Sequence, residues 1–119
     1  MENWLERTQL LVGEDVIKIF SEFSVAVVGL GGVGAYAAEM LVRSGIGNIL
    51  ILDSDAVSIT NKNRQLLALE STLGHQKSEV MAQRLKDINP QLNLTVIDEY
   101  LTPENVEELL SPHKIDFLV

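Results

Sequence analysis

The sequence predicts an α/β protein with a doubly wound, mainly parallel sheet and helices on both faces. Short apolar segments with strand character alternate along the chain with segments whose apolar residues recur at helical spacing. Parallel strands need such helical crossovers, because a tight turn cannot bring two strands side by side in the same direction. The 119 residues are 46% hydrophobic and contain no repeat or Pro/Gly/Ser-rich linker, so we expect one domain over residues 1–119.

The predicted elements follow one another from the N-terminus. A helical segment opens the chain, and an amphipathic helix follows at 15–23. Asn89-Pro90 ends a later helix, and Thr102 is a typical N-cap for a short helix with Pro103 at its first position. The other predicted helices cover 33–43 and 76–88, and the predicted strands cover 25–28, 49–53, 94–98 and 115–119.

A run of closely spaced glycines follows the first predicted strand and leads directly into the next helix. Gly29 allows the backbone to turn sharply, and Gly34 allows the helix to lie close to the strand. Gly31 and Gly32 carry no side chain that would block a phosphate, and the amides at the helix start attract anions. The pattern favours a nucleotide phosphate site in a Rossmann-like fold; the alternative is a tight strand-to-helix turn without a ligand.

Two aspartates lie at the end of the second predicted strand. Asp53 comes 19 residues after Gly34, close to the spacing of about 20 residues expected for an acid that binds the ribose of a nucleotide. Asp53 is therefore the predicted ribose ligand. Asp55 lies on the same face, because side chains two positions apart along a strand point the same way. Its role stays open between orienting a basic neighbour, contacting magnesium and belonging to a simple turn.

The connection after the second strand, at 55–75, is unusually long. Such connections usually take about 2 to 6 residues. It holds Asn61, Asn63, Arg64 and Gln65, whose amide and guanidinium groups suit phosphates and the edges of a base or ribose. An isolated loop arginine is usually only a solvated charge, but these polar neighbours favour binding. We expect the segment to be functional, because it follows a strand at the ligand side of the sheet.

Lys77 falls in the first turn of its predicted helix, where the helix dipole disfavours a cation by about 0.3 to 1 kcal/mol. We therefore expect an anion nearby. It is either a nucleotide phosphate or a surface carboxylate such as Glu70 or Glu79, and the residue pattern leaves both open. His75 and His113 stand in capping or loop positions without a Ser-His-Asp pattern, so we assign neither a catalytic role.

The composition argues against several classes of function. The formal net charge of −8 argues that this segment does not grip nucleic acid by itself, because phosphate binding depends on clustered Lys and Arg. The absence of Cys excludes disulfides, thiolate metal sites and a Cys nucleophile within these residues and is compatible with the cytoplasm. The sequence shows neither the pattern of a secretory signal nor an apolar run near the ~18 residues of a membrane span, so we expect no membrane association.

The last residues, 115–119, have the pattern of a buried parallel strand. Such a strand is normally followed by sheet neighbours and a covering helix. We therefore expect a sheet that is incomplete at the C-terminus, in a chain that is a fragment of a longer protein.

Together these residues resemble the HesA/MoeB/ThiF family of adenylate-forming enzymes, which is related to ubiquitin-activating enzymes. The resemblance covers nearly the whole chain from Arg7 onward. A Rossmann-type dehydrogenase would explain the first strand, the glycines and the acid, but not the Asn, Arg and Lys that follow. The motifs that carry the resemblance are Arg7 ahead of Gly13, Gly29-Leu-Gly-Gly-Val-Gly34, Asp53-x-Asp55 with Asn61-x-x-Arg64-Gln65, and Gly74-x-x-Lys77.

The resemblance implies a role for each of these residues. Arg7 resembles an arginine finger that reaches into the site of a partner subunit, which implies a homodimer. In this chemistry a carboxylate attacks the α-phosphate of ATP and pyrophosphate leaves, so the cations act by electrostatic stabilisation. The Mg²⁺-binding Asp of the family is expected beyond Val119, and the fragment alone is expected to be inactive. The expected catalytic cations are Arg7, Arg64 and Lys77, and the expected nucleotide-binding residues are Gly29, Gly31, Gly32, Gly34, Asp53, Asp55, Asn61, Arg64 and Lys77.

Within the family the sequence most resembles the branch of tRNA threonylcarbamoyladenosine dehydratases, through residues 7–13, 44–47 and 60–65. The resemblance implies that ATP activates the threonylcarbamoyl carboxylate on tRNA and that ring closure expels AMP. Because the segment is acidic, the tRNA-binding surface is expected largely outside it. The alternatives are adenylation of the C-terminus of a sulfur-carrier or ubiquitin-like protein and, more remotely, an NAD-binding oxidoreductase.

Overall fold

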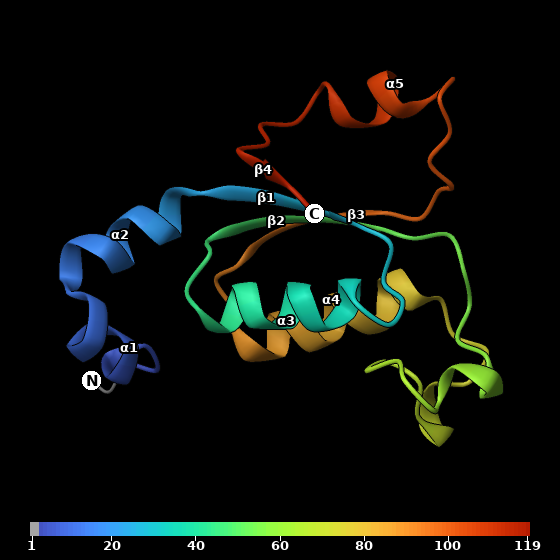
Figure 1. The fold of residues 1–119 in the computed structure, drawn as a ribbon, viewed down its shortest axis with the longest axis horizontal. Helices are drawn as coiled ribbons and strands as arrows, with labels where there is room; N and C mark the ends of the chain where they lie inside the picture. Colours follow the sequence, from blue (N-terminus) through green and yellow to red (C-terminus); the bar gives the residue numbers. More distant parts are fainter. Residues whose placement is uncertain (1–2) are drawn as a thin grey trace.

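A computed structural model describes residues 3–119 and shows a parallel sheet between helices (Figure 1). The sheet has four strands in the order β3-β2-β1-β4, and each neighbouring pair is parallel. The order places β1 in the interior, with the later strands added on either side of it. The strands are β1 (Ser24–Val28), β2 (Asn48–Leu52), β3 (Asn93–Ile97) and β4 (Phe117–Leu118).

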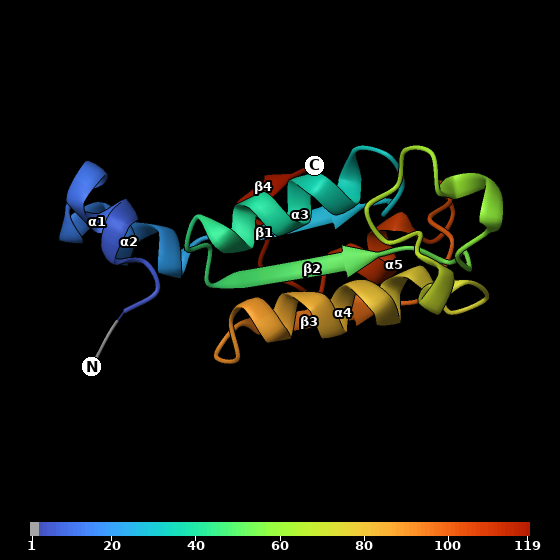
Figure 2. The ribbon, with the colours of Figure 1, turned by 90° about the horizontal axis from the view of Figure 1, so that it is seen from below.

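Helices cover both faces of the sheet, as predicted. The helices α3 (Gly34–Arg43) and α4 (Lys77–Ile88) lie side by side on one face, and the short α5 (Val106–Leu110) lies over the other (Figures 1 and 2). The larger apolar core is under α3 and α4, and the smaller one is under α5. In the described part of the chain, no helix has both the length and the apolar character needed to cross a bilayer. The predicted α/β class is thus confirmed.

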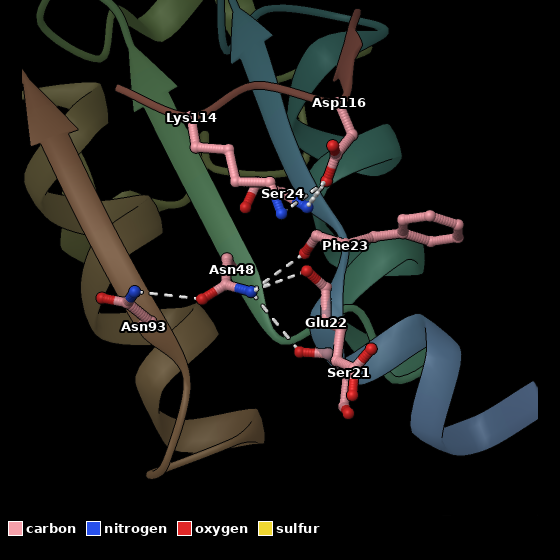
Figure 3. A network of polar contacts seen from close by, with 8 residues as sticks. All are labelled: Ser21, Glu22, Phe23, Ser24, Asn48, Asn93, Lys114 and Asp116. Atoms are coloured by element: carbon pink, nitrogen blue, oxygen red, sulfur yellow. Dashed lines mark hydrogen bonds and ion pairs between the residues drawn. The ribbon is translucent and has the colours of Figure 1, made fainter. Parts of the chain in front are cut away.

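The helices α1 (Glu6–Val12) and α2 (Glu14–Glu22) lie at the end of the sheet where β1 and β2 begin (Figures 1 and 2). Asn48 joins α2 to this end of the sheet (Figure 3). Its amide nitrogen donates to the carbonyl oxygen of Phe23 at 3.1 Å, and its amide oxygen accepts from Asn93 Nδ2 at 3.0 Å. The polar side chains at the amino ends of the strands therefore serve to close the helix end and to join neighbouring strands.

The sequence predicted most boundaries within two residues, but the start of the short C-terminal helix differs by three. The short helix begins at Val106 rather than Pro103, because the intervening residues form a turn. Thr102 still caps this turn, since its Oγ1 accepts the Asn105 N–H at 3.2 Å. The strand predicted at 115–119 is reduced to β4.

The prediction that the last strand is buried was wrong. Phe117 and Leu118 are 54% and 63% exposed, because β4 is an edge strand among the described residues. Its position is fixed at its start by Asp116, whose carboxylate accepts the Ser24 N–H at 2.8 Å (Figure 3).

Glu39 connects α3 to α4 from a buried position. Its Oε1 accepts from Arg84 Nε at 2.7 Å and from Arg43 Nη2 at 3.4 Å, and the residue is 8% exposed. Burial raises the pKa of Glu39, but the hydrogen bond and charge of Arg84 and the charge of Arg43 together outweigh it. The pKa of this carboxyl therefore lies below its ordinary value near 4.5.

Glu39→Gln is expected to lower the free energy of unfolding at pH 7 by about 1 to 2 kcal/mol, because Arg84 loses a charged acceptor. The folded pKa of Glu39 is depressed, so the contribution of the carboxylate is complete above the unfolded pKa and is lost as the pH falls through the folded pKa. Urea unfolding between pH 7 and pH 3 should therefore show the two curves converging at low pH. The exposed Glu108→Gln should match the wild type throughout, and a Glu39 difference that stays constant to pH 3 would contradict the assignment.

Candidate nucleotide-binding site

The loop between β1 and α3 is shaped by two glycines. Gly29 has a φ of 88°, in the left-handed region that side chains disfavour, and its N–H donates to the carbonyl oxygen of Leu52 at 2.8 Å. A methyl group on Gly34 would lie 1.7 Å from the carbonyl oxygen of Gly29. The start of α3 can therefore pack directly against the turn only because Gly34 has no side chain.

Asp53 holds this loop against the end of β2. Its Oδ2 accepts the Leu30 N–H and its Oδ1 accepts the Asp55 N–H, both at 2.7 Å, and the residue is 9% exposed. A carboxylate offers about four acceptor positions, so each oxygen keeps a lone pair for a ligand. The residue that the sequence assigned to the ribose thus also braces the glycine loop, a role that spacing alone did not suggest.

The long connection after β2 folds back on itself and is closed at its base. Val57 donates its N–H to the carbonyl oxygen of His75 at 2.8 Å, and Lys77 donates its N–H to that of Asp55 at 2.9 Å. Two short 3₁₀ turns, η1 (Ile59–Asn61) and η2 (Glu70–Thr72), lie within the loop. The ends of the segment are therefore close together, as in a compact Ω-type loop.

The same loop brings Arg64 and Gln65 against the glycines. A methyl group on Gly32 would lie 3.8 Å from Arg64 Cγ, and one on Gly31 would lie 3.6 Å from Gln65 Nε2. Buried Leu67 anchors this part of the loop in the core. Residues that are more than thirty positions apart in the sequence thus meet at the turn after β1, on the side of the sheet where parallel α/β proteins bind ligands.

Arg64 and Asn61 already have local partners in the loop, whereas the buried Oε1 of Gln65 accepts no hydrogen bond among the described residues. Arg64 Nη1 donates to Asn63 Oδ1 at 2.9 Å and to the carbonyl oxygen of Thr60 at 3.2 Å. Asn61 Oδ1 accepts the Ser58 N–H at 2.9 Å, so this oxygen closes η1 while the amide nitrogen remains available to a ligand. Nothing in the sequence pattern had indicated this structural role for Asn61.

Lys77 is 5% exposed, and its ammonium nitrogen lies 3.9 Å from Asp55 Oδ2. The carboxylates that the sequence suggested as surface partners were the wrong ones. Glu70 instead pairs with Lys62 at 2.8 Å, and the hydrogen bond and charge of Lys62 lower the pKa of Glu70. Glu79 makes no ion pair within the described residues. Of the roles left open for Asp55, orienting a basic neighbour is the one seen in this geometry.

A pocket of about 340 Å³ opens beside the turn at the carboxyl ends of β1, β2 and β3. Neither Arg64 nor Lys77 lines this pocket. Arg64 lies against Gly32, and Lys77 pairs with Asp55, which is itself a lining residue. Three lining residues, Glu99 to Leu101, were not singled out from the sequence, although their place directly after β3 was a usable signal. The lining residues are Val28, Gly29, Leu52, Asp53, Ser54, Asp55, Glu99, Tyr100 and Leu101.

Arg7 is the one predicted site residue that lies in an element far from the loop. It belongs to α1, at the end of the sheet opposite the glycine turn (Figure 1). A single copy of the chain therefore does not bring Arg7 to the pocket. Across residues 3–119, no group of three or more His, Cys, Asp or Glu side chains gathers in a way that suits a metal ion.

A parallel sheet, a glycine turn after its first strand and an acid at the end of the next strand define a Rossmann-type α/β protein. The chain belongs to the ThiF family, whose sequence model matches residues 5–119.

Two curated relatives and one solved structure are similar to most of the chain. The tRNA threonylcarbamoyladenosine dehydratase of Escherichia coli (strain K12) is 46% identical over 91% of this chain and 41% of its own length. That of Bacillus subtilis (strain 168) is 40% identical over the whole of this chain and 46% of its own. The crystal structure of the E. coli enzyme in complex with ATP superposes with a TM-score of 0.91 and 42% identity, covering 96% of this chain and 46% of that one. The chain thus spans under half the length of these relatives.

Proposed function

We propose that residues 1–119 are the N-terminal nucleotide-binding part of an ATP-dependent tRNA threonylcarbamoyladenosine dehydratase. The observation that carries the proposal is the meeting of Arg64 with the glycine turn, together with a buried lysine paired with Asp55, which lines the same pocket as Gly29. A dehydrogenase needs neither cation at this place. The similarity to a dehydratase crystallised with ATP supports the same assignment.

The geometry suggests how the nucleotide lies. The triphosphate meets the amides of the glycine loop and the start of α3, where Gly31 and Gly32 leave room. The ribose hydroxyls reach the free lone pairs of Asp53, and the apolar surfaces of Tyr100 and Leu101 line the pocket beside it.

The reaction then depends on charge neutralisation. As the substrate carboxylate attacks the α-phosphorus, an acyl–adenylate bond forms, the bond to pyrophosphate breaks, and negative charge builds on the leaving group. Arg64 and Lys77 stabilise that charge without taking up a proton. In the second step a nucleophilic atom of the threonylcarbamoyl group attacks the activated carbonyl carbon and gives up its proton to solvent; the new bond closes the ring and the bond from that carbon to AMP breaks. Mg²⁺ would accompany the ATP and neutralise phosphate charge, and its principal protein ligand is proposed to lie beyond Val119.

The complete protein is proposed to act as a cytoplasmic homodimer. Dimerisation would bring Arg7, which one copy keeps far from the pocket, into the site of the partner. Contacts to tRNA are proposed to lie mainly outside this acidic segment, whose formal net charge is −8. The segment alone is proposed to be inactive.

Isothermal calorimetry on the complete protein tests the nucleotide assignment. We expect binding of Mg-ATP and none of NADH. Binding of NADH with indifference to Mg-ATP would identify an oxidoreductase instead.

A turnover assay then tests the acceptor. Release of AMP should depend on tRNA that carries threonylcarbamoyladenosine. AMP release, or a stable adenylate, that requires the C-terminus of a sulfur-carrier or ubiquitin-like protein would support the alternative acceptor.

A further inference from the structure

The contact between Asp55 and Lys77 combines a buried cation with an exposed anion. The side chain of Lys77 is 7% exposed and that of Asp55 is 72% exposed. The backbone of Asp55 is held on both sides, because its N–H donates to Asp53 at 2.7 Å and its carbonyl oxygen accepts the Lys77 N–H at 2.9 Å. The carboxylate therefore stands on a fixed piece of chain directly beside the ammonium group.

This contact is weak for a buried charge. The distance from Nζ to Oδ2 is 3.9 Å, longer than the 2.7 to 2.9 Å that is typical of a charge-assisted hydrogen bond. Lys77 also begins α4, where the helix dipole repels a cation. An ammonium group has three donors, and within the described residues Nζ makes no hydrogen bond. The charge of Asp55 thus neutralises the ammonium group only in part, and the N–H donors of this group remain available to a stronger acceptor.

Arg64, like Lys77, lacks a strong acceptor among the described residues. Its guanidinium donates only to neutral oxygens, Asn63 Oδ1 and the carbonyl oxygen of Thr60. A phosphate forms stronger, charge-assisted hydrogen bonds than either of these acceptors. Arg64 beside the glycine turn and Lys77 beside Asp55, which lines the pocket, therefore both have partners that an incoming triphosphate would displace.

We infer that Asp55 is a positioning residue that serves as the resident counterion of Lys77 when the nucleotide site is empty. Resting on the proposed function, the inference is that the triphosphate replaces the carboxylate as the partner of the ammonium group. Asp55 thereby stabilises the empty protein and weakens nucleotide binding by competition. The geometry favours this role over direct magnesium binding for two reasons. The Asp55 carboxylate faces a lysine, and among residues 3–119 it belongs to no group of three or more side chains that could hold a metal ion.

Asp55→Asn in the complete protein tests the inference by calorimetry with ATP in EDTA and with Mg-ATP. Removing the competing charge is expected to tighten the binding of metal-free ATP by roughly 3- to 10-fold. Glu79→Gln is the matched control, since it removes an equal charge from the first turn of α4, where Lys77 also lies, but from a residue that forms no ion pair with Lys77. Its affinities should equal those of the wild type. Weaker binding of Mg-ATP with unchanged binding of metal-free ATP would overturn the inference and identify a magnesium ligand.

A double-mutant cycle in thermal unfolding, without nucleotide, gives a second readout. Asp55→Asn should lower the melting temperature, because the buried ammonium loses its counterion, and Lys77→Met should remove most of that loss in the double variant. Additive effects of the two substitutions would show that no coupling exists and would overturn the inference. If the wild type binds no ATP at all, the proposed function fails, while the cycle still decides whether Asp55 neutralises Lys77.

Discussion

Gly34→Ala is expected to abolish nucleotide binding and to lower the free energy of unfolding by about 3 kcal/mol or more. The added methyl group would lie 1.7 Å from the carbonyl oxygen of Gly29 and 2.8 Å from its carbonyl carbon. Both are backbone atoms in a turn held by hydrogen bonds to β2 and to Asp53, so neither can move aside alone. The clash can be relieved only by separating α3 from the turn, which opens the loop that would hold the phosphates.

Gly32→Ala is the matched control in the same loop. Its methyl group would meet only the flexible stem of Arg64, at 3.8 Å and 3.9 Å, which is ordinary contact. Urea unfolding should therefore show stability within about 1 kcal/mol of the wild type. Calorimetry should still show weaker ATP binding, because the methyl group occupies space that a phosphate needs. Equal stability of the two variants would refute the proposed packing of α3 on the turn.

The overall architecture followed from the sequence because local pattern and global fold agree in most of the chain. The strands β1 and β2 are nearly continuous apolar runs, as strands covered on both faces must be, and α4 carries a regular apolar stripe. The C-terminal part was predicted less well. The apolar residues of β4 predicted burial, but whether a strand is buried depends on what lies beside it, and this is a tertiary property.

The candidate site was predicted in its location but not in its internal contacts. Parallel topology brings the ends of β1 and β2 together, so the meeting of the glycines with Asp53 was predictable from spacing. The ion pair of Lys77 with Asp55 was not, because it depends on how a long loop closes at its base. Sequence proximity and charge suggested Glu70 and Glu79, but neither forms an ion pair with the ammonium group. The fold also left Arg7 at the opposite end of the sheet (Figure 1).

Asp53→Asn is expected to lower the free energy of unfolding by about 3 kcal/mol in the absence of any ligand. Both carboxylate oxygens accept a backbone N–H at 2.7 Å, one from Leu30 and one from Asp55. An asparagine has a single oxygen, so in either orientation its NH₂ group faces one of these donors. The residue is 9% exposed, and water therefore compensates little for the lost hydrogen bond. Chemical unfolding of the complete protein without nucleotide measures the effect.

The same variant separates two roles of Asp53. If the carboxylate only bound the ribose, the substitution would weaken ATP binding and leave the empty protein as stable as the wild type. Because it also holds the glycine turn to β2, stability and affinity should fall together. Asp98→Asn is the matched control, since Asp98 follows β3 as Asp53 follows β2 but is exposed. It should change neither quantity, and an equal loss of stability in both variants would show that the effect is one of net charge rather than of the brace on the loop.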